Sequence, residues 1–241
     1  MPSPDSFNPF PLNAALWPAV CRLKIAFPAS PDGSRVTWVG GSGCLIGPRL
    51  VLTAGHNVYN FVPALGRSTF ALGGVAIFPG PREVAIERGE TNDQWAGEAG
   101  GRLSFASQYD VGVFSLQERL PFEVFRPKFV ADDDRLRTGG VNVVGYPIVP
   151  PLGPNGQQYL YGTLFGGLTE VEVGPGRFAY PMRMMEGVSG GPVYIKDGTT
   201  RVVCGVHNSR FVEPPGPERY GGVRIHADVK SLIDQWMTAY P

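Results

Sequence analysis

Residues 186–193 read Glu-Gly-Val-Ser-Gly-Gly-Pro-Val and place a single hydroxyl side chain, that of Ser189, among three glycines. Glycine adopts backbone conformations that other residues avoid, so such a run can turn several backbone N–H groups toward one point. A nucleophilic serine needs this setting, with backbone donors directed at the oxygen on which negative charge develops. The alternative is a glycine-rich hairpin turn with an incidental serine. The octapeptide alone leaves both interpretations open.

The composition favours many short strands. Glycine (33 residues) and proline (24) make up about a quarter of the 241 residues, but 43% of the chain is hydrophobic and only 17% is charged. That balance is the reverse of the one that keeps chains disordered. Turn-forming residues recur between short apolar segments, which predicts an all-β fold.

Three local features refine this prediction. Gly40-Gly41 is expected to interrupt a strand, and residues 79–101 are expected to be a surface excursion with one short strand at 83–86. Residues 228–239 carry the chain's only convincing helical pattern, which we expect to begin with Asp228 as the N-cap. Its apolar face consists of Val229, Leu232, Ile233, Trp236 and Met237.

Charge and hydropathy limit the partners. The net charge is zero and no block of Lys or Arg occurs, so the electrostatic footprint of a nucleic-acid binder is missing. The longest apolar run, residues 70–78, is far shorter than the roughly 20 residues that span a bilayer. The start of the chain does not resemble a signal peptide. We therefore expect a cytoplasmic protein, or a secreted one if a signal peptide was trimmed, and neither a nucleic-acid nor a membrane partner.

The three cysteines fit neither a disulfide framework nor a metal site. Cys21, Cys44 and Cys204 are odd in number, far apart and set among apolar residues. Buried free thiols are expected, because free cysteine is among the most buried residue types. No metal and no cofactor is predicted, and the sequence gives no indication of the oligomeric state.

Two further residues could complete a catalytic site. His56 follows the apolar segment 50–52 and has small neighbours that leave its ring approachable, and histidine is the commonest general base. Asp110 stands directly before an apolar strand, where a carboxylate is costly unless it is paired. The alternatives are a structural histidine at a strand end and an aspartate in a turn.

The order of these residues separates two kinds of serine site. Gly187-Val188-Ser189-Gly190-Gly191 also matches the G-x-S-x-G nucleophile elbow, which should open a helix and be followed by Asp and then His. Gly190-Gly191-Pro192 begins a helix poorly, and only 52 residues follow Ser189. The order His56, Asp110, Ser189 is instead that of chymotrypsin.

Three segments resemble the signatures of trypsin-like serine proteases. They are Leu52-Thr53-Ala54-Gly55-His56, Tyr109-Asp110-Val111-Gly112-Val113 and Gly187-Val188-Ser189-Gly190-Gly191-Pro192. Three others look closer to the bacterial glutamyl endopeptidase branch: Gly145-Tyr146-Pro147, Gly205-Val206-His207 and the segment 222–229. The resemblance covers residues 18–239. It implies two antiparallel six-stranded β-barrels, with the site between them and a C-terminal helix at 228–239.

The resemblance also implies boundaries and roles. Residues 1–18 would be an N-terminal arm, 19–122 the first barrel and 123–241 the second barrel with the helix. Ser189 would be the nucleophile, His56 the base and Asp110 its orienting carboxylate, and the N–H groups of Gly187 and Ser189 would form the oxyanion hole. The partner would be a protein or peptide substrate. The alternative is a catalytically silent binding or scaffold module on the same fold, because fold does not imply function.

Two residues depart from the trypsin pattern. Val188 stands where trypsins carry an aspartate that pairs with a newly cleaved N-terminus, so that route of activation is absent. Asn57 stands where a cysteine usually follows the catalytic histidine, so the neighbouring disulfide is absent too. The missing disulfide fits a reducing compartment.

The substrate pocket is inferred by counting along the resemblance. His207 falls where the glutamyl branch has its pocket histidine, and Arg183 and Arg210 fall near the pocket walls. Such groups would favour Glu or Asp before the scissile bond. Met184 departs from this pattern, because the branch places a hydroxyl residue there. The alternative for His207 is a core histidine bonded to the backbone, and His226 is expected to be structural.

Overall fold

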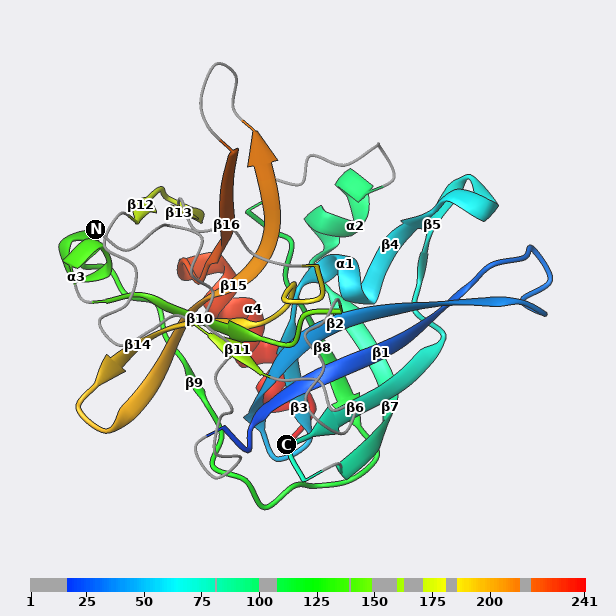
Figure 1. Ribbon diagram of the computed structural model, residues 1–241, viewed down its shortest axis with the longest axis horizontal. Coiled ribbons are helices and arrows are strands. Elements are labelled where there is room, and N and C mark those ends of the chain that lie inside the picture. The colour runs from blue at the N-terminus through cyan, green and yellow to red at the C-terminus, as the bar shows by residue number, and fades with distance from the viewer. Residues whose placement is uncertain are drawn as a thin grey trace.

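The computed structural model describes residues 17–80, 82–99, 108–138, 140–148, 160–162, 171–180, 186–212 and 218–241. Two groups of mostly antiparallel strands dominate these residues, and the groups lie side by side (Figure 1). The all-β prediction and the C-terminal helix are confirmed. Among the helices that the structure describes, none is both long and apolar enough to cross a membrane.

The first group closes into a barrel because its first strand has hydrogen-bonded neighbours on both sides. This strand, β1, pairs with β2 along its whole length and with β6 over residues 22–26. Around the barrel the strands are β1 (Val20–Pro28), β2 (Val36–Gly47), β3 (Leu50–Thr53), β8 (Gly112–Leu116), β7 (Arg82–Thr91) and β6 (Gly73–Phe78). Alternation along β1 buries Leu23, Ile25 and Phe27 in the core. Burial of side chains of this size contributes about 1.5–3 kcal/mol each.

The expected interruption at Gly40-Gly41 is wrong, because β2 runs through it. Gly40 and Gly41 pair with Lys24 and Leu23 of β1. A Cβ atom at Gly40 would lie 2.8 Å from the Ile148 side chain, and one at Gly41 would lie 2.6 Å from Nδ2 of Asn57. These glycines are therefore explained by close neighbours on the strand surface rather than by a turn.

The expected surface excursion at 79–101 is also wrong. Its first part is β7, a full barrel strand that pairs with β6 and β8. Only Val84 and Ile86 of this strand are fully buried, so the segment reads as polar. A short helix, α2 (Asp93–Ala99), follows. A small hairpin of β4 (Tyr59–Val62), the 3₁₀ helix η2 (Pro63–Leu65) and β5 (Arg67–Phe70) projects from the same barrel.

The second group is an eight-stranded sheet that includes one parallel pair, β9 with β15. The other seven strands follow the order β11, β10, β14, β15, β16, β13, β12. In the chain they are β9 (Arg126–Pro127), β10 (Asn142–Gly145), β11 (Tyr161–Gly162), β12 (Glu172–Val173), β13 (Arg177–Tyr180), β14 (Pro192–Asp197), β15 (Thr200–Val212) and β16 (Glu218–Arg224). Another short helix, α3 (Asp133–Thr138), lies between β9 and β10 in the chain. Closure of this sheet into a second barrel is not seen among the described residues and stays a prediction.

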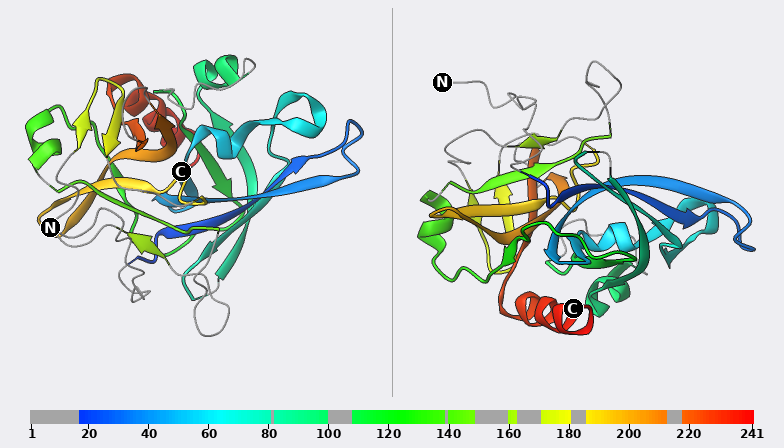
Figure 2. Two further views of the ribbon diagram at one scale, coloured as in Figure 1. Left: turned by 45° about the horizontal axis from the view of Figure 1, so that its top comes forward. Right: turned by 90° about the horizontal axis from the view of Figure 1, so that it is seen from below.

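The C-terminal helix α4 (Ala227–Ala239) leaves the second sheet and returns to the first barrel. Figure 2 shows it on the outside of the two groups of strands. Its buried Val229, Ile233 and Trp236 belong to the same apolar cluster as the barrel core. The expected N-cap is wrong by two positions: His226 is the N-cap and Asp228 lies in the first turn. A negative charge in that turn still stabilises the helix through its dipole.

The chain termini and cysteines complete the fold. All three cysteines are free and buried as expected, and burial raises the pKa of the Cys204 thiol to about 12. Trp17, inside the expected arm 1–18, packs against Phe125 and Tyr194. The rest of that arm, residues 1–16, lies outside the described residues, and the boundaries of the arm and the two halves stay predictions.

Candidate active site

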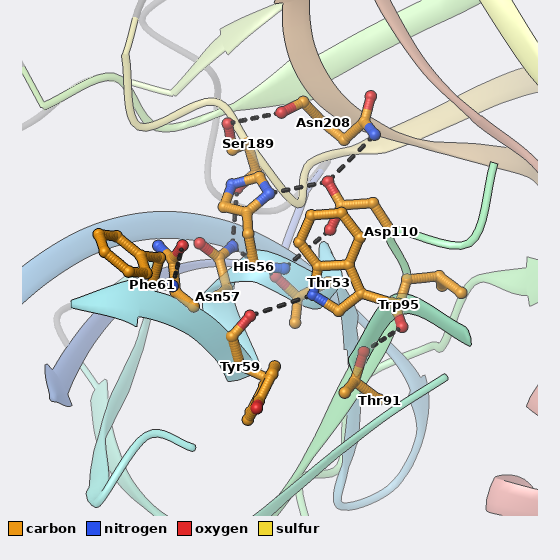
Figure 3. Close-up of polar contacts among 12 residues, drawn as sticks. Thr53, His56, Asn57, Tyr59, Phe61, Thr91, Trp95, Asp110, Ser189 and Asn208 are labelled. Carbon is orange, nitrogen blue, oxygen red and sulfur yellow. Dashed lines mark hydrogen bonds and ion pairs between the residues drawn. The ribbon is translucent and has the colours of Figure 1, made fainter. Parts of the chain in front are cut away.

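His56 and Asp110 meet because they extend from two strands that are hydrogen-bonded neighbours. The end of β3, Thr53, pairs with Gly112 at the start of β8. The chain leaving β3 and the chain entering β8 therefore lie at one edge of the barrel. His56 follows in the short helix α1 (Gly55–Val58), and Asp110 stands two residues before β8. Figure 3 shows the two side chains turned toward each other, with Ser189 beside the imidazole ring.

The carboxylate of Asp110 receives three hydrogen bonds. Oδ1 accepts from the backbone N–H of His56 at 2.8 Å, while Oδ2 lies 2.9 Å from His56 Nδ1 and 3.1 Å from Asn208 Nδ2. Asp110 is only 1% exposed, and a carboxylate at that depth needs such donors in place of water. Because an ionised carboxylate only accepts, we assign the proton to His56 Nδ1, which leaves Nε2 as the basic nitrogen.

Opposing effects set the pKa of His56. Burial acts to lower the pKa of this imidazole, because a charged ring loses hydration. The charge of Asp110 and the hydrogen bond to it act in the opposite direction and prevail, so the pKa of His56 is raised above 6.5. The pair is therefore suited to accept a proton at Nε2 near neutral pH.

The surroundings of this pair are tightly packed. A Cβ atom at Gly55 would lie 2.8 Å from Cδ1 of Trp95 and 3.0 Å from Oδ1 of Asp110, which explains the glycine before His56. Trp95 of α2 is fully buried, and its indole N–H donates to the carbonyl of Tyr59 at 3.0 Å. Its ring meets the ring of His56 at an angle of 60° with 6.5 Å between centroids. Trp95 thus covers one side of the His56–Asp110 pair.

Two glycines give residues 186–191, the nucleophile loop, its shape. Gly187 and Gly190 have φ values of +92° and +90°, in the region that favours glycine. A Cβ atom at Gly187 would lie 2.5 Å from the backbone nitrogen of Ile148, and one at Gly190 would lie 2.1 Å from the carbonyl oxygen of Ser42. The hydroxyl of Ser189 donates to the carbonyl of Asn208 at 3.4 Å, which is long for a hydrogen bond.

Two N–H groups of this loop have no acceptor among the residues that the structure describes. Ile148 N–H donates to the carbonyl of Glu186 at 2.7 Å, so this carbonyl faces Ile148. In a trans peptide the N–H of Gly187 then points the opposite way. Within the described part of the chain, the N–H groups of Gly187 and Ser189 donate to no protein acceptor. Two unpaired donors next to a serine hydroxyl are the arrangement that stabilises an oxyanion.

His207 lies beside the nucleophile loop on β15. Its backbone exchanges hydrogen bonds with Gly190 and Gly191 at 2.7 and 2.9 Å. Its ring is buried, with Nδ1 2.5 Å from the hydroxyl of Tyr180. Burial, and then the charge of His56, lower the pKa of His207 to about 3, while a hydrogen bond with the backbone of Gly221 acts to raise it. The imidazole of His207 is therefore neutral at neutral pH.

The structure does not describe the side chains of the other predicted pocket residues. Arg183 and Met184 lie outside the described residues. Arg210 lies on β15, but its side chain is outside what the structure describes. The structure therefore brings together His56, Asp110, Ser189 and the N–H of Gly187, with His207 adjacent, and it leaves the expected pocket walls undescribed.

Sequence reasoning missed several residues of this site. Asn208 bonds Asp110 through its side chain and Ser189 through its carbonyl, and only its place after His207 hinted at it. Trp95 lies in a segment that is otherwise polar. A single tryptophan in such a segment was the only feature of the sequence that could have indicated its buried position. Ser42 and Tyr180 had no motif to mark them. In the ranges that the structure describes, no group of three or more His, Cys, Asp or Glu side chains is placed to hold a metal ion.

Comparison with known folds identifies solved structures of the same shape. A Glu endopeptidase in complex with MPD has a TM-score of 0.74 and 18% identity, with 97% of each chain covered. The protease Anisep from Arthrobacter nicotinovorans has a TM-score of 0.63 and 17% identity, covering 93% of this chain and 96% of its own. A thermostable serine protease AL20 from an extremophilic microorganism has a TM-score of 0.63 and 18% identity, covering 94% and 98%. At these identities the likeness establishes the fold.

Comparison with protein families gives the membership. The curated proteins with which the sequence was compared include no significant match. Residues 41–206 match the family described as the trypsin-like peptidase domain, which is more than half of the chain. This range includes His56, Asp110 and Ser189. The chain therefore belongs to the trypsin-like peptidase family, and it is a hydrolase of the serine endopeptidase class.

Proposed function

We propose that the chain hydrolyses peptide bonds in proteins or peptides through a triad of Ser189, His56 and Asp110. One observation carries this proposal: the hydroxyl of Ser189 lies beside an imidazole whose Nδ1 is held by a buried carboxylate, and beside two backbone N–H groups that have no acceptor in the described ranges. Nucleophile, base, orienting group and oxyanion donors are then all present within one site.

Acylation would begin when Ser189 Oγ turns from the carbonyl of Asn208 toward Nε2 of His56. The hydrogen bond that it leaves is 3.4 Å long, so the rotation costs little. Oγ attacks the scissile carbonyl carbon and Nε2 takes the hydroxyl proton. The carbonyl electron pair moves onto oxygen, where the N–H groups of Gly187 and Ser189 stabilise the charge. Collapse of this intermediate breaks the C–N bond, and the leaving amine takes the proton from His56.

Deacylation would repeat these steps with water. His56 Nε2 removes a proton from water as the water oxygen attacks the acyl carbon. Collapse of the second intermediate breaks the bond to Ser189 Oγ, which recovers its proton from His56. In both halves the carboxylate of Asp110 stabilises the imidazolium form, in line with its raising effect on the pKa of His56.

A fluorophosphonate probe tests this assignment directly. The probe forms a covalent bond only with a serine whose hydroxyl is activated and whose oxyanion site is formed. We expect one probe per folded chain, with the adduct located by peptide mass mapping on Ser189, and no adduct after heat denaturation. Folded protein that takes up no probe, or takes it up at another residue, would contradict the triad.

We also infer a preference for Glu or Asp before the scissile bond. His207 supports it, because its backbone bonds to Gly190 and Gly191 place it next to the nucleophile loop. Burial raises the pKa of Tyr180 well above its usual value, so its phenol stays protonated and can donate to Nδ1 of His207. The neutral ring then carries its own N–H on the other nitrogen, and a substrate carboxylate would take this N–H in place of the backbone of Gly221. The shared fold with a Glu endopeptidase adds support.

The variant His207→Gln is expected to lower kcat/KM for substrates with Glu before the scissile bond about 10- to 100-fold, the effect of losing a hydrogen bond to a charged group. Substrates with other residues there should change less. A peptide library scanned with both proteins measures this difference. The matched control is His226→Gln, because His226 caps α4 rather than adjoining the nucleophile loop. Wild-type cleavage after Lys, Arg or large apolar residues would reject the acidic preference.

A further inference from the structure

Every carbonyl of residues 186–189 is held by a donor, and two of these four carbonyls are held by the first barrel. Gly191 N–H donates to Val188 and Ile148 N–H to Glu186. The other two carbonyls accept side-chain hydrogen bonds from β2 and α1: the Ser42 hydroxyl donates to the Gly187 carbonyl at 2.7 Å, and Asn57 Nδ2 donates to the Ser189 carbonyl at 3.1 Å. The peptide planes that carry the N–H groups of Gly187 and Ser189 contain the carbonyls held by Ile148 and Gly191. Ser42 and Asn57 hold the planes that alternate with these two, on the C-terminal side of Gly187 and of Ser189.

Ser42 joins three segments at one point. Its side chain is fully buried, and its hydroxyl accepts from the N–H of Tyr146 at 2.7 Å while donating to Gly187. Its own N–H donates to the carbonyl of Ser189 at 2.8 Å. Loss of the hydroxyl would leave a buried N–H and a buried carbonyl without this partner, which is costly in the protein interior.

Asn57 makes a second connection between the first barrel and the nucleophile loop, at the carbonyl of Ser189. Its amide is buried, and Nδ2 uses both hydrogens, one on the Ser189 carbonyl and one on Oγ1 of Thr53 at 2.8 Å. Oγ1 of Thr53 in turn donates to the carbonyl of Ser42 at 2.8 Å. Gly41 makes room for this amide, because a Cβ atom there would lie 2.6 Å from Nδ2.

All of these contacts are neutral. Val188, at the centre of the loop, is fully buried in the second apolar cluster. Its side chain packs against the backbone of Gly145, where a Cβ atom would lie 3.0 Å from Cγ1 of Val188. A buried charge at residue 188 or beside it would lack the partners that its lost hydration requires.

We propose that Ser42 and Asn57 are positioning residues that hold Gly187 and Ser189 in the catalytic conformation, with no ionised partner at residue 188. The inference rests on the proposed function. It assigns to two neutral side chains, from β2 and α1, the orientation of the peptide planes that follow Gly187 and Ser189, between and beside the planes of the oxyanion donors. A variant that lacks either side chain would keep the triad residues, but its nucleophile loop would adopt the catalytic conformation in only a fraction of the molecules. The value of kcat would fall in proportion to that fraction.

The test uses Ser42→Ala and Asn57→Leu, the second of which roughly keeps the size of the side chain and removes its N–H donors without adding a charge. Both are expected to lower kcat about 10- to 100-fold while KM changes little. The pH at which kcat/KM is half-maximal should not move, because His56 and Asp110 are untouched. The control Asn142→Ala removes another buried amide, one that donates to the carbonyl of Gly140, and should lower stability but not kcat. Rates are measured well below each unfolding midpoint and divided by the concentration of folded chain.

Separate results would overturn the two proposals. Wild-type protein that neither labels nor turns over would contradict the proposed function. Wild-type protein that labels normally, alongside Ser42→Ala and Asn57→Leu variants with wild-type kcat, would contradict only the positioning role. A further measurement needs no core substitution: a chain with a Gly/Ser extension at its N-terminus should label at the wild-type rate. Loss of labelling in the extended chain would show that the loop depends on a free α-amino group.

Discussion

Replacement of Ser189 by alanine is expected to lower kcat for peptide hydrolysis about 10⁶-fold, the size of effect seen when a triad serine is removed. The hydroxyl is the group that would form the acyl bond, and the neighbouring N–H donors would supply only the small rate that remains. Stability should change little, because Ser189 Oγ makes a single long hydrogen bond, to the carbonyl of Asn208. Initial rates on a fluorogenic peptide and the thermal midpoint measure the two quantities.

The matched control for this substitution is Ser115→Ala. Ser115 lies on β8 and is 2% exposed, and its hydroxyl has no hydrogen-bond partner in the part of the chain that the structure describes. This variant should keep wild-type kcat, because the lost hydroxyl is far along the strand from the site. If Ser189→Ala retained a tenth of the wild-type rate, the nucleophile would have to be another residue.

The catalytic candidates could be predicted from the sequence because each is marked locally. His56 follows an apolar segment and a glycine, Asp110 precedes an apolar strand, and Ser189 lies among glycines. Such short patterns can be recognised in a single sequence, because each depends only on the residues of one strand or turn. The structure then adds the pairing of β3 with β8, which explains why the first two residues meet.

The supporting contacts could not be predicted because they join residues far apart in the chain. The hydroxyl of Ser42 bonds a carbonyl 145 residues away, and the amide of Asn208 bonds a carboxylate 98 residues away. Neither residue stands in a recognisable motif. Separation in the chain also explains the wrong prediction at Gly40-Gly41. Gly41 is required because the side chain of Asn57 lies against it, and no local sequence pattern indicates that contact.

Replacement of Asp110 by asparagine is expected to lower kcat about 10⁴-fold with the fold intact. All three contacts of the carboxylate come from donors: the backbone N–H of His56, its Nδ1 and the amide of Asn208. An asparagine offers one acceptor and one donor, so in either orientation its NH₂ faces a donor. The orientation that spares the backbone N–H places NH₂ against Nδ1 of His56. The ring then accepts at Nδ1 and carries its proton on Nε2, where it can no longer act as a base.

The pH profile of kcat/KM distinguishes this change of tautomer from a loss of activity caused by disturbed folding. In the wild type the pKa of His56 is raised, and its neutral form is the base, so kcat/KM should rise with pH and reach half its maximum above pH 6.5. Without the carboxylate, only burial acts on the ring, so the half-maximal pH of the residual activity should move below 6.5. The control Asp133→Asn breaks an ion pair with Arg224 in the second group of strands, and should move neither kcat nor the profile. An unshifted profile for Asp110→Asn would mean that Asp110 does not set the protonation of His56, and the triad would then lack its third member.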